Sequence, residues 1–226
     1  MRKVVLIATI FVTMGATAQT PKEWRDSISV LIQQLDQSPN SIDLRLKKAE
    51  ANINLGQYDY AINEYSKVLK QDDKNLAAMY FRAFCHTQLR HYDMARADYE
   101  AFLTIQPEHL EAHLEAHLGL AHVLQLLGRK TDATDELNRC VLLFPDSADA
   151  YAARAAHETQ LQQYDAALYD WDEALRLKPS DASLAASKAD VLIKMEKWRD
   201  ARQTLDNAVK QGTPRAALKE WYDKLK

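Results

Sequence analysis

The stretch that decides the fold is YDAALYDWDEALRLKP, residues 164–179. Ala167, Trp171 and Ala174 follow one another at helical intervals, which places them on one face of a helix. Pro179 ends that helix, because proline cannot donate the backbone hydrogen bond that a continuing helix requires. The stretch therefore predicts an amphipathic helix with a face of small, large and small side chains.

The same pattern recurs along the chain in four separate registers. The register of Ala167 has spacings of 34, 38, 34 and 34 residues and consists of Ala61, Ala95, Ala133, Ala167 and Ala201. The other three share the single irregular step and consist of Pro39, Asp73, Pro107, Pro145 and Pro179; of Leu55, Leu89, Leu127, Leu161 and Met195; and of Ala49, Ala83, Ala121, Ala155 and Ala189. Such a period predicts two short helices per unit. The turns between them are expected at Gly56, Arg90, Gly128, Gln162 and Glu196, in the left-handed geometry that ends many helices.

The composition excludes several classes of protein. Only 5 Gly and 6 Pro interrupt a chain that is 47% hydrophobic and 27% charged, which argues against glycine-dependent phosphate-binding folds. The net charge of -3 and the lack of a Lys/Arg block argue against binding of nucleic acid. No H-E-x-x-H, CxxC or Ser/His/Asp arrangement is present, so we expect no enzymatic activity and no cofactor.

The repeating unit resembles the tetratricopeptide repeat family, whose pattern is a small residue, an aromatic residue four positions later and a terminal proline. The match is fullest at Ala167, Trp171, Ala174 and Pro179. The resemblance covers about residues 22–226. It implies an all-α fold: a right-handed α-solenoid of helix-turn-helix repeats with a capping C-terminal helix. The chain departs from the family early in the first helices, where Trp and Leu are usual; it has instead Arg45 and Lys48, Met79 and Arg82, and Ala185 and Lys188.

The registers divide the chain into a leader and one repeat domain, residues 19–226. We expect a half-repeat at 22–39, repeats at about 42–75, 76–109, 114–147, 148–181 and 182–213, and a cap helix at 214–226. Thr213 is expected to be the N-cap of that helix, with Pro214 at its first position.

Residues 1–18 are expected to be a secretory signal peptide. Arg2 and Lys3 precede an apolar run, residues 4–16, that is too short to span a bilayer. The small residues of Ala16-Thr17-Ala18 predict cleavage before Gln19. We therefore expect an exported protein, periplasmic or secreted and soluble, without membrane insertion of the mature chain; an uncleaved anchor is the alternative.

The resemblance also implies a partner-binding surface, because the first helices of tetratricopeptide repeats line a concave groove that binds peptides or partner helices. The positions that correspond to this groove include Leu46, Glu50, Ile53, Tyr80, Phe84, Thr87, Leu118, His122 and Gln125. The Lys and Asn with which some members clamp a terminal carboxylate are missing. We expect a scaffold that binds another protein or peptide, in cell-envelope assembly or recruitment. In the alternative, Tyr80 and Phe84 pack between neighbouring repeats or under the N-terminal cap helix.

The irregular spacing comes from a tandem HLEA duplication that places His109, His113 and His117 one turn apart. One interpretation is a metal-binding or metal-responsive protein that uses His109 and His113; the other is a helix extended by one turn. His117 occupies a core position, whereas we expect His113 to lie on the added turn and to tolerate alanine. For Cys85 and Cys140, free buried thiols and a single disulfide both remain open.

Overall fold

The computed structural model describes residues 20–105 and 110–225, except for the side chains of residues 110–112. The expected signal peptide, its cleavage site and His109 lie outside these residues. Every regular element of the described chain is helical, and within each of its two compact units successive helices pack on one another. The prediction of an all-helical repeat array is confirmed.

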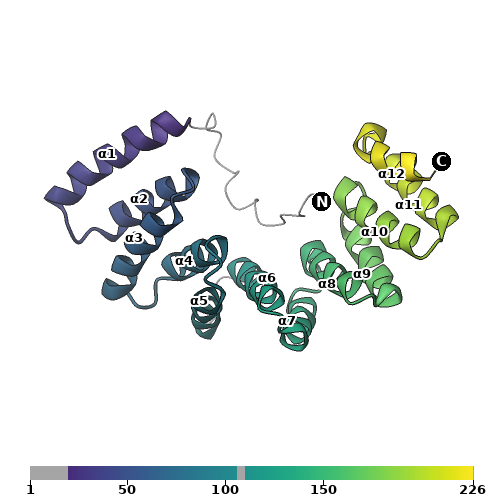
Figure 1. The fold of residues 1–226 in the computed structure, drawn as a ribbon, viewed down its shortest axis with the longest axis horizontal. Helices are drawn as coiled ribbons and strands as arrows, with labels where there is room; N and C mark the ends of the chain where they lie inside the picture. The colour runs from purple at the N-terminus through teal and green to yellow at the C-terminus, as the bar shows by residue number, and fades with distance from the viewer. Residues whose placement is uncertain (1–19, 106–109, 226) are drawn as a thin grey trace. The chain divides into compact units, whose positions relative to one another are not determined.

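By its contacts the chain divides into two compact units, with the boundary after Arg90. The N-terminal unit contains four helices, drawn in purple and blue in Figure 1: α1 (Pro21–Gln37), α2 (Ile42–Asn54), α3 (Tyr58–Gln71) and α4 (Leu76–Gln88). Helix α1 packs on α2, α2 on α3, and α3 on α4.

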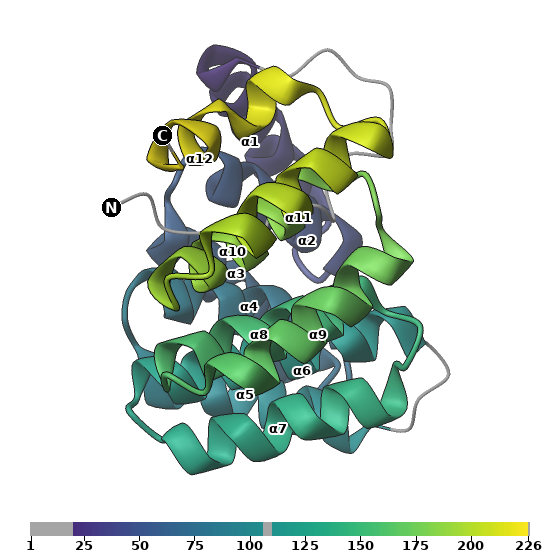
Figure 2. The same ribbon diagram turned by 90° about the vertical axis from the view of Figure 1, so that its right-hand side faces the viewer.

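The C-terminal unit continues the same alternation of first and second helices. It contains α5 (Tyr92–Thr104), α6 (Leu110–Leu126), α7 (Lys130–Leu143), α8 (Ala148–Gln160), α9 (Tyr164–Leu177), α10 (Ala182–Lys194) and α11 (Trp198–Lys210), followed by the 3-10 helix η1 (Arg215–Leu218) and α12 (Lys219–Lys224). Figure 2 shows the end of this unit, where α11, η1 and α12 lie.

The turns within the repeats have the expected left-handed backbone. The φ angles are positive at Gly56, Arg90, Gly128, Gln162 and Glu196, with values between 59° and 74°. Arg90, Gln162 and Glu196 carry side chains, so their left-handed backbone is strained. The turn between the two helices of a repeat requires this geometry.

The registers of the sequence form the core of each unit. In the N-terminal unit, Ala49, Ala61 and Tyr65 are buried in one cluster with Val68 and Cys85. The same positions recur in the C-terminal unit, where Ala155, Ala167 and Trp171 form the cluster between α8 and α9. The small residues let two helices approach closely, and the large residue fills the space beside them.

The C-terminal segment corrects one local prediction. Thr213 caps no helix, because its hydroxyl donates a hydrogen bond to the carbonyl oxygen of Ser180, 2.7 Å away. Pro214 precedes a 3-10 turn instead, and α12 begins only at Lys219. Leu218 and Tyr222 are buried against α10 and α11, so the segment still covers the apolar end of the last repeat.

Candidate functional site

The expected groove residues of the N-terminal unit lie on its two first helices, Leu46, Glu50 and Ile53 on α2 and Tyr80, Phe84 and Thr87 on α4. All are buried or half-buried. Leu46, Ile53 and Phe84 pack against the core cluster of this unit. Burial raises the pKa of the Glu50 carboxyl.

The aromatic residues of α4 have packing partners within the same unit. The Phe84 and Tyr58 rings are nearly perpendicular, with 6.1 Å between their centroids, and the Tyr80 and Phe81 rings are likewise nearly perpendicular at 5.2 Å. Tyr80 is only 8% exposed. An alanine substitution at either position therefore removes core packing in addition to any contact with a partner.

In the C-terminal unit the expected residues Leu118, His122 and Gln125 lie on α6. His122 is exposed, whereas the Gln125 amide lies 3.0 Å from Nδ1 of His157 on α8. The other nitrogen of His157 lies 2.9 Å from the Thr134 hydroxyl on α7. Burial lowers the pKa of His157, so its imidazole is neutral at pH 7 and joins three helices as a structural group.

The prediction that His113 tolerates alanine is wrong, because the residue is buried. His113 is 6% exposed; its Nε2 lies 3.2 Å from the carbonyl oxygen of Ile105 and its ring packs against Phe102 at 5.3 Å. Its replacement by alanine therefore removes a buried contact. His117 has the expected core position, with Nδ1 bonded to the Glu136 carboxylate on α7.

The described residues offer little to a metal ion or to redox chemistry. No group of three or more His, Cys, Asp or Glu side chains among them could hold a metal. Cys85 and Cys140 are both free and buried, and burial raises the pKa of each thiol to about 12. Both therefore remain protonated and unreactive at neutral pH.

A series of buried carboxylates is the feature that the sequence analysis missed. One lies three residues after the alanine of the Ala167 register in each of the first four repeats: Glu64, Asp98, Glu136 and Asp170. Their spacing of 34, 38 and 34 residues repeats that of the alanines. This shared period is the signal that could have identified them. The fifth repeat has Thr204 at the same position, also buried.

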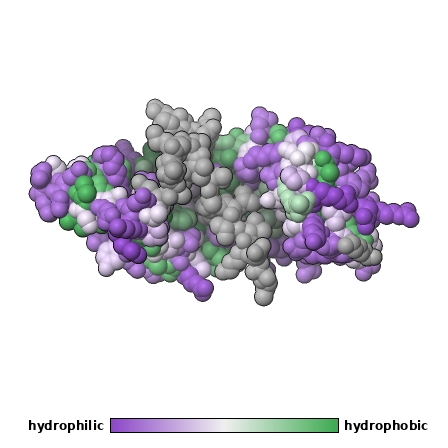
Figure 3. Space-filling model, turned by 90° about the horizontal axis from the view of Figure 1, so that it is seen from above, coloured by the Kyte–Doolittle hydropathy of each residue, from purple (hydrophilic) through white to green (hydrophobic). Residues whose placement is uncertain are grey.

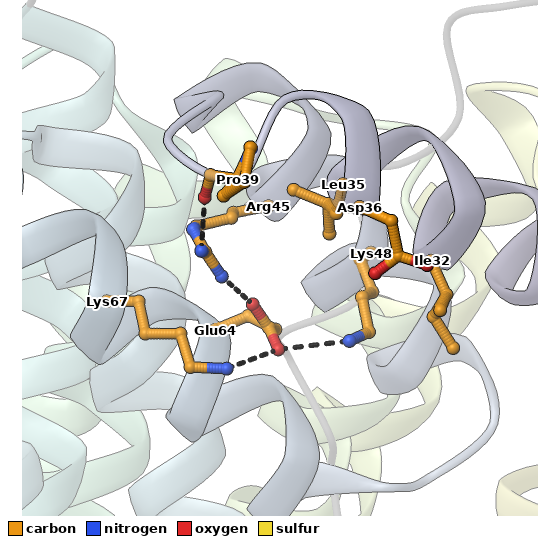
Figure 4. A pocket seen from close by; sticks show the side chains of 8 residues that line it. All are labelled: Ile32, Leu35, Asp36, Pro39, Arg45, Lys48, Glu64 and Lys67. Atoms are coloured by element: carbon orange, nitrogen blue, oxygen red, sulfur yellow. Dashed lines mark hydrogen bonds and ion pairs between the residues drawn. The ribbon is translucent and has the colours of Figure 1, made fainter.

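Glu64 is held by three cations. Its Oε2 accepts from Arg45 Nη1 at 2.8 Å, and its Oε1 accepts from both Lys48 at 3.1 Å and Lys67 at 3.0 Å (Figure 4). Burial favours the neutral acid, but the hydrogen bonds from Lys67, Lys48 and Arg45 outweigh it and lower the pKa of Glu64. The departures at Arg45 and Lys48 thus have a structural reason: they bind the buried acid.

Asp170 is held by one guanidinium. Arg154 Nε donates to its Oδ2 at 2.6 Å and Nη2 donates to its Oδ1 at 2.8 Å, which is the planar two-bond geometry of an arginine–carboxylate pair. Glu158 lies nearby, and its buried Oε2 has no hydrogen-bond partner among the described residues. Burial and the charge of Asp170 raise the pKa of Glu158 to about 7.

Comparison with known proteins agrees with this fold. Residues 46–109 match the tetratricopeptide repeat family. The chain is 24% identical over 236 residues to the DnaJ protein P58IPK homolog B of Oryza sativa subsp. japonica, covering 83% of this chain and 50% of that protein. It is 25% identical over 146 residues to the human mitochondrial import receptor subunit TOM70, covering 64% of this chain and 24% of that protein. The chain thus spans about half, or less, of the curated relatives it matches.

Solved structures show the same repeat fold at low identity. A tetratricopeptide repeat protein from Parabacteroides merdae superposes with a TM-score of 0.64 at 19% identity, covering 90% of this chain and 78% of that one. YrrB, a repeat protein with an unusual peptide-binding site, superposes with a TM-score of 0.58 at 17% identity, covering 85% and 97%.

The fold and the repeat registers define the class of structure: this chain folds as an all-helical array of tetratricopeptide repeats, and residues 46–109 match that family. Proteins of this class are generally non-catalytic scaffolds for protein–protein interaction. Within the described residues, no helix is long and apolar enough to cross a bilayer. Hydrophilic residues dominate the face shown in Figure 3, and hydrophobic residues are scattered over it.

Proposed function

We propose that this protein is an exported scaffold that binds another protein or peptide through the faces of its first helices, in cell-envelope assembly or recruitment. The observation that carries the proposal is the accessibility of the first helix α6. His122 is exposed there, and Leu118 and Gln125 on the same helix are half-buried. YrrB, which shares the fold, has a peptide-binding site.

Position 122 gives the sharpest test of the binding surface, because His122 is exposed on a first helix. A photo-crosslinking amino acid placed there should capture a discrete partner from the native envelope fraction. The matched control places the same amino acid at Asp135, an exposed position on the second helix α7. Equal capture from both positions, or none from position 122, would remove the first-helix face as the binding surface.

The export part of the proposal is supported by residues 1–18 alone. Mass spectrometry of the protein from its native host should find a chain that begins at Gln19, in the soluble exported fraction. An intact Met1 or recovery only with membranes would overturn this part and leave the binding surface to the crosslinking test.

A further inference from the structure

Half-buried cations of three first helices have oxygen acceptors on the preceding second helix, in each case sixteen residues earlier. Arg82 Nη1 donates to Ser66 Oγ at 3.1 Å, Arg154 Nη1 donates to Asn138 Oδ1 at 3.1 Å, and Lys188 pairs with Asp172. The third repeat has Leu120 at the cation position and needs no acceptor. The arrangement is therefore a regular device that joins one repeat to the next.

The first repeat has the cation but lacks the acceptor. Lys48 occupies the register of Arg82, Arg154 and Lys188, and the residue sixteen positions before it is Ile32 on α1. Isoleucine accepts no hydrogen bond, and Ile32 is 44% exposed. A hollow of about 330 Å³ lies at this place, and its lining includes Ile32, Leu35 and Asp36 of α1, Lys48 of α2, and Glu64 and Lys67 of α3. Figure 4 shows Ile32 and Lys48 on the same side of it.

The hollow carries an excess of hydrogen-bond donors. The ammonium groups of Lys48 and Lys67 bond the same oxygen of Glu64, at 3.1 and 3.0 Å, so they lie no more than about 6 Å apart. Each ammonium has three N–H donors, and within the described chain Glu64 is the only acceptor recorded for either. Two adjacent cations with unused donors form a receptor for one more anionic oxygen pair.

The other residues that line the hollow determine which kind of anion it can bind. Ile32 and Leu35 of α1 contribute apolar surface to the lining, and Asp36 adds a negative charge to it. A highly charged anion would meet Asp36 and Glu64, whereas a single carboxylate with an apolar neighbour meets both the donors and the apolar surface.

We propose that this hollow binds an acidic side chain of a partner peptide, whose carboxylate takes the place that Ser66, Asn138 and Asp172 take in the other repeats. An apolar side chain beside it packs on Ile32 and Leu35. The site uses none of the residues expected in the groove and is independent of the proposed function.

The direct test is titration of the isotope-labelled full chain with N-acetyl-Leu-Glu-Leu-amide, followed by NMR. Saturable shifts should be confined to the residues around the hollow on α1, α2 and α3. The matched peptide with Gln in place of Glu should bind at least tenfold more weakly, because it lacks the charge. Equal binding of the two peptides would overturn the proposal. Acetate or inorganic phosphate binding as tightly as the Glu peptide would also overturn it, by showing a simple anion site.

Two pairs of variants separate binding from folding. Lys48→Gln should weaken binding of the Glu peptide at least tenfold, whereas Lys47→Gln, one residue away and paired with exposed Asp43, should leave it unchanged. Ile32→Asp places a carboxylate at the missing position and should abolish peptide binding while the chain stays folded by circular dichroism. Val30→Asp, at a similarly exposed position of α1, should still bind. Normal binding by Ile32→Asp would contradict the assignment.

Discussion

The first and fourth repeats each bury a carboxylate, but they pair it with different numbers of cations. Glu64 in the first repeat shares three separate cations and lies beside an open hollow. Asp170 in the fourth repeat depends on the single guanidinium of Arg154, which also reaches Asn138 on the preceding second helix. In the first repeat, the carboxylate would keep two cations if one were lost, and a hollow lies beside it. In the fourth repeat, the carboxylate has one cation. The comparison teaches that one register can contribute stability in one repeat and leave a binding site in another.

The largest expected effect is at the pair of Arg154 and Asp170. Arg154→Met should lower the free energy of unfolding by about 3–5 kcal/mol, because Asp170, with a side chain only 1% exposed, keeps its charge without a partner. This loss corresponds to a fall in Tm on the order of 10 °C. Urea unfolding followed by circular dichroism measures it, with Arg176→Met as a control at an exposed ion pair.

A double variant checks the cause. Arg154→Met combined with Asp170→Leu should recover much of the lost stability, because no buried charge is then left alone. If the double variant is no more stable than Arg154→Met, lost packing rather than an unpaired carboxylate explains the effect.

The next effect tests the aromatic register of the two units. In the N-terminal unit Tyr65 stacks on Phe81 at 6.1 Å. In the C-terminal unit the corresponding Tyr99 lies against Gly119, where an added Cβ would approach the Tyr99 Cζ to 2.5 Å. Gly119→Ala should therefore cost about 1–3 kcal/mol by overpacking, although alanine is the better helix former. Gly128→Ala is unsuitable as a control, because its φ is +74°; Ser29→Ala on α1 tests helix propensity at an exposed position instead. A gain in Tm for Gly119→Ala would show that Tyr99 moves aside freely.

These comparisons also show how far sequence reasoning reaches. The helices, the left-handed turns at Arg90, Gln162 and Glu196, and the alanine core follow from local periodicity, because the repeat imposes the same geometry on each unit. The same period shows that Glu64 and Asp170 occupy equivalent positions, but it does not show that they are buried. A charge on a helix is usually solvated, and its burial is decided by the neighbouring helix rather than by its own spacing.

His113 illustrates the same limit. The four-residue insertion shows that α6 gains a turn, but not that Phe102 and the Ile105 carbonyl cover that turn from the end of α5. Likewise, Thr213 before Pro214 has the local signature of an N-cap, and its hydroxyl bonds the Ser180 carbonyl more than thirty residues away. In both cases a contact made outside the residue's own helix or turn overrides a local preference.

The pH dependence should differ in sign between the two acid clusters. The pKa of Glu158 is raised to about 7, against about 4.3 in the unfolded chain. Between these values the folded state binds a proton that the unfolded state has lost, so stability falls as pH rises through this window. Glu64 has a lowered pKa, so its contribution is present above about pH 4.3 and is lost as pH falls through its folded pKa.

Glu158→Gln removes the first of these dependences. The variant should gain about 2–4 °C in Tm at pH 8, corresponding to about 1 kcal/mol, and little or nothing at pH 5. Glu173→Gln on the neighbouring helix is the control at an acid paired with exposed Arg176. The same gain at both pH values would contradict a protonated Glu158 in the folded protein.

The smallest expected effect is at Glu64 and its three cations, and it tests whether this carboxylate depends on any single cation. Lys48→Met leaves Glu64 bonded to Arg45 at 2.8 Å and to Lys67 at 3.0 Å. The buried carboxylate therefore keeps two cations, and the loss should not exceed about 1 kcal/mol. The methionine also lies beside Ile32 and Leu35, where its apolar side chain offsets part of that loss. Urea unfolding of Lys48→Met beside Lys47→Met measures the difference. A loss as large as that of Arg154→Met would mean that Lys48 alone holds Glu64, and its ammonium would then have no capacity to spare for a partner.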